Sequence, residues 1–210
     1  MPVPWSNIDG FSELCFIIGS GPSNDDYPDN FFPELFELGT VVGVNNVAVD
    51  FPCHFNVRKS FGEERLVPEE LPTFGYRNPD CQLIISEHDC GTISTKELMN
   101  TNVSGDYYYF EHKDNLISKG VNWPEGEDEI IVSWSTMTSA MHLAAALGSK
   151  LIVLIGHDLG GKNYRGYPSA PGPRYSKFSK QSIAVKSYLE DRYECSIVSL
   201  IPYLGLGRRR

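Results

Sequence analysis

A candidate phosphate-binding turn lies near the start of the chain. Residues 14–18 (Leu-Cys-Phe-Ile-Ile) are apolar without a break, as in a strand that is buried on both faces of a parallel sheet. The glycines that follow let the backbone turn sharply and let a ligand approach exposed amides. Asn24 stands where the dinucleotide fingerprint has its third glycine, so an ordinary strand-to-loop turn is the alternative reading. The candidate nucleotide-binding residues here are Gly19, Ser20, Gly21, Pro22 and Ser23.

A second turn of the same kind follows another apolar run late in the sequence. Residues 150–155 predict a buried strand, and Gly156, His157 and Asp158 come directly after it. Because these residues would lie at the carboxyl end of a strand, His157 and Asp158 are candidate acid-base groups, with Gly156 beside the ligand. Before this strand, residues 133–140 open a predicted helix that runs to Leu147, and Ser135 and Thr136 are the candidate ligand contacts at its start. Hydroxyl groups at a helix start can cap free amides and can also hold a phosphate.

Further polar residues follow two other predicted strands. Asn45 and Asn46 come after residues 40–44, and Arg58 comes after residues 53–57. In a doubly wound sheet the carboxyl ends of the strands form the ligand edge, so these side chains are candidate contacts to a nucleotide or its phosphate. A plain loop is an equal alternative for the asparagines, and a solvated cation is the alternative for Arg58.

A segment rich in glycine, proline and tyrosine follows the second turn. We expect residues 159–180 to form a mobile loop over the site. Several cations lie there in a chain whose formal net charge is −9, which suits an anionic ligand. Arg174 is the candidate for neutralising charge during catalysis. The other candidate loop contacts to phosphate are Tyr164, Arg165, Tyr175 and Lys177.

Composition limits the class of protein. The chain has 210 residues, enough for one α/β domain, and its acidity argues against general nucleic-acid binding. Its five cysteines are scattered without a Cys-x-x-Cys pair, so no metal site is predicted and a reducing cytoplasm is expected. No run of apolar residues is long enough to cross a membrane, and the amino terminus does not resemble a signal peptide. A homo-oligomer is left open.

The order of the predicted elements indicates the fold class. Buried strands alternate with predicted helices at 31–38, 133–147 and 182–193, and further strands are expected at 82–86 and 195–200. This order predicts a single α/β domain with a Rossmann-like, mostly parallel sheet and helices on both faces. Residues 87–129 are expected to be an insertion or lid with one or two strands. Within it, the aromatic run 107–110 is expected to pack in a core or strand.

The two glycine turns, Asn45 and the Ser135-Thr136 helix start together resemble a known group. The pattern is similar to the Rossmann-like superfamily of bacterial lipooligosaccharide sialyltransferases and 6-hydroxymethylpterin pyrophosphokinase-like proteins. It spans residues 14 to about 200, though the middle matches only in outline. In the sialyltransferases the corresponding positions hold the CMP part of the donor. The resemblance therefore implies that the glycine turn, Asn45, Ser135 and Thr136 hold a nucleotide.

The resemblance implies a nucleotide-dependent transferase that acts on a small-molecule acceptor. The first expectation is a glycosyltransferase that uses a CMP-sugar or a similar donor. The sialyltransferases carry a catalytic histidine in the loop before the penultimate helix, and the corresponding loop here has tyrosines and Arg174 without a histidine. The alternatives are an ATP- and Mg-dependent pyrophosphokinase-like enzyme, with Asp158 near the magnesium ion, and a nucleotide-binding protein without catalysis.

Overall fold

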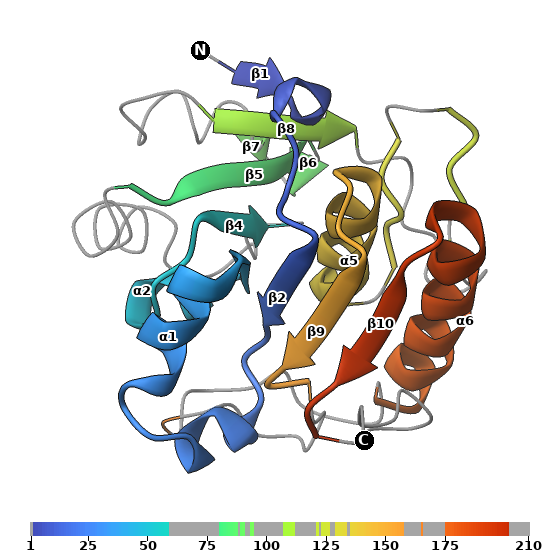
Figure 1. The fold of residues 1–210 in the computed structure, drawn as a ribbon. Helices are drawn as coiled ribbons and strands as arrows, with labels where there is room; N and C mark the ends of the chain where they lie inside the picture. Colours follow the sequence, from blue (N-terminus) through green and yellow to red (C-terminus); the bar gives the residue numbers. More distant parts are fainter. Residues whose placement is uncertain are drawn as a thin grey trace.

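The chain forms an α/β fold in a computed structural model (Figure 1). The structure describes residues 2–58, 80–87, 89–90, 93–94, 107–111, 121, 123–126, 129–133, 135–157, 165 and 175–201. Its strands are β1 (Pro2–Pro4), β2 (Leu14–Ile18), β3 (Thr40–Val44), β4 (Phe55–Arg58), β5 (Gln82–Glu87), β6 (Asp89–Cys90), β7 (Ile93–Ser94), β8 (Tyr107–Glu111), β9 (Leu151–Ile155) and β10 (Ser196–Ser199). Its helices are η1 (Trp5–Asn7), η2 (Pro22–Asp26), α1 (Phe31–Leu38), α2 (Val47–Asp50), α5 (Thr136–Ala146) and α6 (Tyr175–Tyr193).

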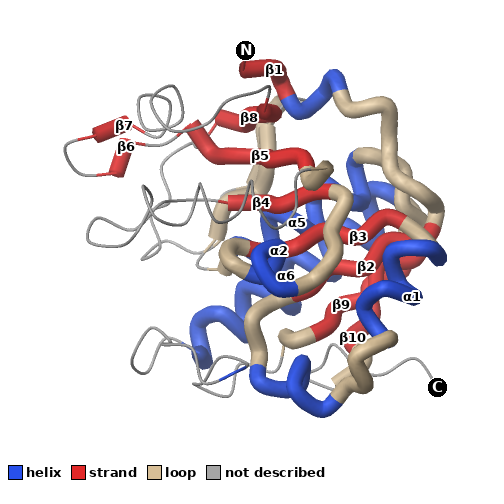
Figure 2. The backbone as a smooth tube through the Cα atoms, turned by 90° about the vertical axis from the view of Figure 1, so that its left-hand side faces the viewer, coloured by secondary structure: helices blue, strands red, loops and turns tan. Residues whose placement is uncertain are grey.

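Eight strands form one parallel sheet in the order β1-β8-β5-β4-β3-β2-β9-β10. Figure 2 shows this succession from β1 at one edge to β10 at the other. From β2 the chain adds β3, β4, β5 and β8 on one side, then returns to place β9 and β10 on the other side. The strand order therefore reverses between β2 and β9, and such a switch point is where open α/β sheets bind ligands.

Alternate residues of each central strand face opposite layers of the protein. Cys15 and Ile17 of β2 pack in a core with α5 and α6, whereas Phe16 and Ile18 pack in a second core with α1 and α2. The helices accordingly cover both faces of the sheet (Figure 1). Because β2 is buried on both faces, its sequence is an uninterrupted run of apolar residues. Burial also raises the pKa of the Cys15 thiol to about 12, as expected for a small core residue.

The structure confirms the predicted fold class and most element positions. The observed bounds of β2, α1 and β3 are those predicted from the sequence. Residues 107–111 pair as β8 between β1 and β5 in the main sheet, so the aromatic run is core packing, although we expected the surrounding segment to be an insertion. Helix α6 begins at Tyr175, inside the segment that was expected to be a loop. β1 was not predicted; its prolines are tolerated because it is an edge strand.

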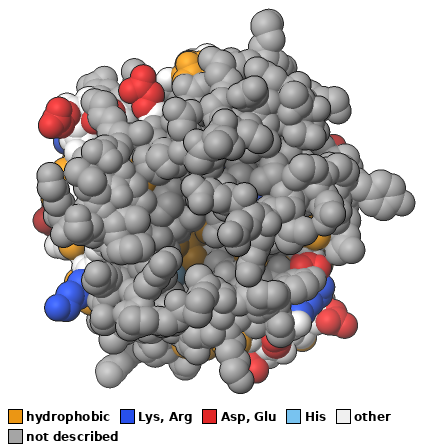
Figure 3. All heavy atoms as spheres, turned by 180° about the vertical axis from the view of Figure 1, so that it is seen from behind, with side chains coloured by type: hydrophobic (Ala, Val, Ile, Leu, Met, Phe, Trp, Pro, Cys, Tyr) orange, Lys and Arg blue, Asp and Glu red, His pale blue; other side chains and the backbone are white. Residues whose placement is uncertain are grey.

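The surface of the described residues carries charges of both signs. Seen from behind, acidic and basic side chains lie scattered around the rim, and the described residues show no basic patch there (Figure 3). None of the helices in the described part of the chain is both long and apolar enough to span a bilayer.

Candidate functional site

The strand register places the three predicted polar turns side by side. Ile18 at the end of β2 lies opposite Ile155 in β9 and opposite Gly43 in β3. The segments that follow these strands therefore leave the sheet at the same edge. They carry the glycine turn, Gly156 with His157, and Asn45 with Asn46. The two turns that lie farthest apart in the sequence meet at the switch point, as the sequence predicted.

Backbone hydrogen bonds join the first glycine turn to the turn after β9. The amide of Gly19 donates to the carbonyl oxygen of Ile155, and the amide of Gly21 donates to that of Gly156, both at 2.8 Å. A Cβ atom on Gly19 would lie 2.7 Å from the Gly156 carbonyl oxygen, so the joint requires glycine. Both glycine amides are engaged in this joint, so they are not the exposed amides that the sequence led us to expect. Ser20, which lies between them, is half-buried.

Asn24 fills the space between the two turns. Its Nδ2 donates to the carbonyl oxygen of Gly19 at 2.7 Å, and only 3% of the residue is exposed. A Cβ atom on Gly156 would lie 2.5 Å from Asn24 Oδ1, and Gly156 itself has a φ of +62°. Sequence reasoning noted Asn24 only as a missing third glycine. The structure shows that its carboxamide packs against the joint, which a glycine could not do.

The start of α5 lies against the same joint. A Cβ atom on Gly19 would be 2.7 Å from the Cε atom of Met137 in the first turn of this helix. Ser135 caps the helix, and its Oγ accepts from the amide of Met137 at 3.3 Å. Thr136 is 8% exposed, and its hydroxyl forms no hydrogen bond with a described residue. The predicted Ser135-Thr136 pair thus lies at the switch point, with Ser135 engaged in capping.

Asn45 has a left-handed backbone that two hydrogen bonds hold in place. Its φ is +57°; its amide donates to the carbonyl oxygen of Val57 at 3.0 Å, and its own carbonyl oxygen accepts from Asn56 Nδ2 at 2.8 Å. Asparagine tolerates this conformation better than most residues. The side chains of Asn45 and the neighbouring Asn46 are exposed at the edge of the sheet.

Arg58 supports the Asn45 turn through Asn56. Its guanidinium Nε donates to Asn56 Oδ1 at 3.0 Å, and Arg58 is only 3% exposed. Asn56 is completely buried and also donates to the carbonyl oxygen of Gly43 at 3.1 Å. Sequence reasoning named Arg58 as a phosphate contact and missed Asn56. The observed contact orients an amide that holds the turn, so we describe Arg58 as a positioning residue.

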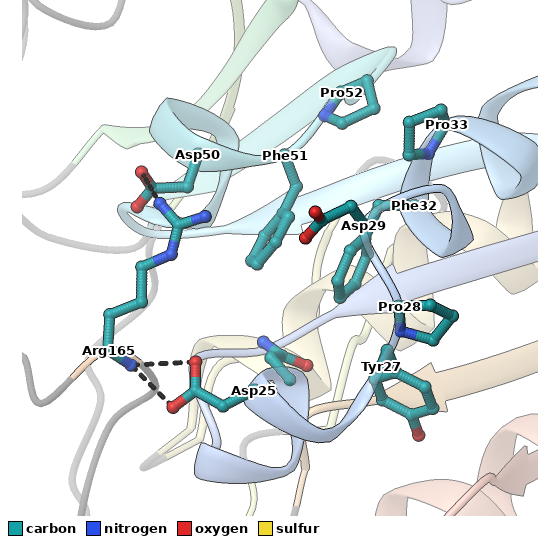
Figure 4. Close-up of a pocket in the computed structure, with 11 residues that line it drawn as sticks. Asp25, Tyr27, Pro28, Asp29, Phe32, Pro33, Asp50, Phe51, Pro52 and Arg165 are labelled. Atoms are coloured by element: carbon teal, nitrogen blue, oxygen red, sulfur yellow. Dashed lines mark hydrogen bonds and ion pairs between the residues drawn. The ribbon is translucent and has the colours of Figure 1, made fainter.

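Arg165 contacts acidic residues in the structure. Its main-chain amide donates to both carboxylate oxygens of Asp25, at 2.8 and 3.1 Å, and its guanidinium lies 2.6 Å from Asp50 Oδ1. The guanidinium carbon is also 5.6 Å from the centre of the Phe51 ring. Arg165 was predicted to contact phosphate; here it ties the segment after β9 to those after β2 and β3 (Figure 4).

The candidate catalytic groups are described only in part. His157 is 3% exposed and lies directly after Gly156 at the switch point. Asp158, Tyr164 and Arg174 lie outside the described residues. Tyr175 and Lys177 belong to the first turn of α6. Within the described part of the chain, no three His, Cys, Asp or Glu side chains are grouped to hold a metal ion.

His142 lies in the core, away from the ligand edge. Its Nδ1 accepts from the amide of Ile131 at 2.9 Å, and its Nε2 is 2.9 Å from the hydroxyl oxygen of Tyr193. Burial, reinforced by the nearby charge of Arg192, lowers the pKa of His142 to about 4. The structure therefore identifies His142 as a neutral structural residue.

The fold is similar to those of known glycosyltransferases. MAf glycosyltransferase from Magnetospirillum magneticum AMB-1 matches 91% of this chain with a TM-score of 0.55 and 16% identity, and this chain spans 33% of its length. The sialyltransferase CST-II, in complex with a trisaccharide acceptor and CMP, matches 94% of this chain with a TM-score of 0.53 and 15% identity. The match covers 86% of the length of the sialyltransferase chain. No family model and no curated protein sequence matches the chain. The fold is therefore Rossmann-like and is shared with glycosyltransferases.

Proposed function

We propose that this protein is a nucleotide-dependent glycosyltransferase whose donor is a CMP-sugar. The observation that carries the proposal is the convergence of the Gly19–Ser23 turn, the Gly156 turn and the start of α5 at the switch point of the sheet. Ligands bind at such points in open α/β sheets. Three sialyltransferase structures with TM-scores above 0.5 contain CMP on a similar fold, which supports the choice of nucleotide.

The available polar groups suggest how the nucleotide would be held. The hydroxyls of Ser20 and Thr136 and the carboxamide of Asn45 form no hydrogen bond with a described residue. Hydroxyl and amide groups can contact the ribose, base and phosphate of a nucleotide. We propose these three side chains as direct contacts, with the glycines, Asn24 and Arg58 shaping the turns that present them.

The reaction would join the sugar carbon of the donor to an acceptor hydroxyl and release CMP. The acceptor oxygen forms the new bond, the bond from the sugar carbon to the phosphate oxygen breaks with its electron pair, and the acceptor proton goes to a base. We propose His157 or Asp158 as this base and Arg174 as the cation that neutralises the leaving phosphate. Positioning of the donor and the acceptor supplies the rest of the rate enhancement.

Two other functions fit the same site. An ATP- and Mg-dependent diphosphate transfer would use the same turn, with Asp158 near the metal. The loop before α6 has no histidine, which favours a protein that binds the nucleotide without catalysing a reaction. Cys15, Cys53, Cys81 and Cys195 are free thiols, and on this ground we propose a cytoplasmic location.

A nucleotide panel separates these functions. The melting temperature of the protein would be measured with CMP, UDP, and ATP with and without Mg, because a ligand that binds only the folded state raises it. The proposal predicts a rise with CMP, and release of CMP from a CMP-sugar in the presence of an acceptor. A rise only with ATP and Mg would replace it with diphosphate transfer. Binding of CMP without turnover of any CMP-sugar would indicate a binding protein.

A further inference from the structure

One row of residues across the sheet contains a buried amide among positions without polar side chains. The strand register places Ile155, Ile18, Gly43, Asn56 and Leu83 next to one another in β9, β2, β3, β4 and β5. The two isoleucines and the leucine belong to the apolar core on the α1 and α2 side, and Asn56 is completely buried among them. A buried polar group costs free energy unless it is hydrogen-bonded, so packing alone does not account for an asparagine at this position.

The carboxamide of Asn56 joins β3 to the turn that follows it. Its Nδ2 donates to the carbonyl oxygen of Gly43 at 3.1 Å and to that of Asn45 at 2.8 Å. Gly43 belongs to β3, whereas Asn45 is the first residue after the strand. An apolar side chain in this row could pack but could not bind either carbonyl oxygen. We therefore attribute the buried amide to the shape of the Asn45 turn.

Arg58 determines the orientation of this carboxamide. A carboxamide can be turned by 180°, which exchanges its oxygen and its nitrogen. The guanidinium Nε of Arg58 is a donor at 3.0 Å from Oδ1 of Asn56, so it selects the orientation in which the oxygen faces Arg58. Both N–H groups of Asn56 are then left for the two carbonyl oxygens. A charged donor makes a stronger hydrogen bond than a neutral one, so Arg58 holds this orientation firmly.

The backbone of Asn45 is consequently held on both sides of its Cα atom. Its amide donates to the carbonyl oxygen of Val57, and its carbonyl oxygen accepts from Asn56. Its φ of +57° is uncommon for a residue other than glycine, and such a conformation persists where the surrounding contacts impose it. Because the backbone is fixed, the direction in which the exposed side chain of Asn45 leaves the chain is fixed as well.

We infer, taking the proposed function as the basis, that Asn56 and Arg58 are positioning residues of the nucleotide site. Asn56 is completely buried, so it acts on the nucleotide through the Asn45 side chain that it sets in place. Arg58 acts one step further back, because it orients Asn56. Replacing either residue therefore weakens nucleotide binding only while the Asn45 carboxamide is present.

A double-mutant cycle with CMP tests this dependence. Asn56→Ser keeps a hydroxyl that can donate to one carbonyl oxygen but cannot bind both. Isothermal titration would give the dissociation constant of CMP for the wild type, Asn56→Ser, Asn45→Gly and the double variant. Asn56→Ser should weaken CMP about tenfold in the wild-type background. In the Asn45→Gly background the same change should alter the dissociation constant by less than about twofold.

Ser149→Ala is the matched control for general loss of stability. It removes a buried side-chain hydrogen bond of 2.9 Å to the carbonyl oxygen of Ser12, which lies before the amino end of β2. This variant should be destabilised but should bind CMP as the wild type does. If Asn56→Ser does not fold, Arg58→Lys enters the same cycle, because it keeps the charge but loses the planar donor, and it should show the same dependence on Asn45.

The outcomes distinguish this inference from the proposed function. A wild type that does not bind CMP would overturn the proposed function, and the positioning roles would fall with it. If the wild type binds CMP but Asn56→Ser or Arg58→Lys weakens it equally in both backgrounds, the positioning roles alone would be overturned. Unchanged CMP binding by both variants in the wild-type background would overturn them as well.

Discussion

The side-chain amide of Asn24 donates a hydrogen bond of 2.7 Å to the carbonyl oxygen of Gly19, at the point where the turns after β2 and β9 meet. The same carboxamide lies so close to Gly156 that a Cβ atom there would be 2.5 Å from its Oδ1. Three short segments therefore depend on one another for their shape.

Replacing Gly156 with alanine should destabilise the protein strongly. The substitution places a Cβ at a φ of +62° and against Asn24 and the Gly19 carbonyl oxygen. Gly148→Ala is the matched control, because Gly148 has a φ of +101° but no atom within 4 Å of its would-be Cβ. We expect a loss of roughly 1–3 kcal/mol for the control from backbone strain. Gly156→Ala should lose clearly more in urea denaturation; an equal loss would show that the joint is not tightly packed.

Asn45 offers a way to remove a side chain without straining the backbone. Glycine accepts the left-handed φ of +57° at this position, whereas alanine does not. Asn45→Gly should therefore retain the stability of the wild type but weaken CMP binding, measured by isothermal titration. Asn45→Ala should lose both stability and binding. If Asn45→Gly binds CMP as the wild type does, the Asn45 carboxamide is not a ligand contact.

Two threonines in the first turn of α5 should respond differently to valine. Thr138 Oγ1 donates to the carbonyl oxygen of Ser135 at 2.7 Å and lies 2.6 Å from Ser133 Oγ, whereas Thr136 forms no such bond. Thr138→Val should cost about 1–3 kcal/mol of stability, because it leaves buried polar groups without partners. Thr136→Val should weaken CMP binding with little effect on unfolding. The reverse pattern would place the ligand elsewhere.

His142 should make the stability depend on pH. Its folded pKa, about 4, lies below the value of about 6.5 for an unfolded histidine. The unfolded state therefore binds the proton first as the pH falls. The stability that neutral His142 adds to the folded state is complete above about pH 6.5. It is lost as the pH falls towards 4, by an amount on the order of 3 kcal/mol. Urea denaturation at several pH values should show a smaller loss for His142→Gln over this range; an identical slope would contradict the assignment.

The sequence predicted the central strands well because local patterns determine them. β2, β3 and β9 are buried on both faces, so their apolar runs stop sharply at glycine or asparagine. Their convergence followed from the general rule for parallel sheets. The place of β8 in the main sheet was harder to predict, because its partners β1 and β5 are distant in the sequence.

The supporting residues of the site could not be predicted from local patterns. Asn24 and Asn56 are polar side chains in segments that read as a turn and a short strand, and their roles depend on contacts with neighbouring segments of the fold. Arg165 is separated from Asp25 by 140 residues and from Asp50 by 115, and no spacing in the sequence indicates those contacts.

If a nucleotide binds at the joint between the two glycine turns, amide chemical-shift mapping with CMP will locate it there. The amide signals of Ser20, Asn45, Thr136 and Gly156 should shift together and saturate at one CMP concentration, while the amide signal of Asp29 should stay unchanged. Shifts confined to another surface, or no shift at any of these four amides, would contradict it.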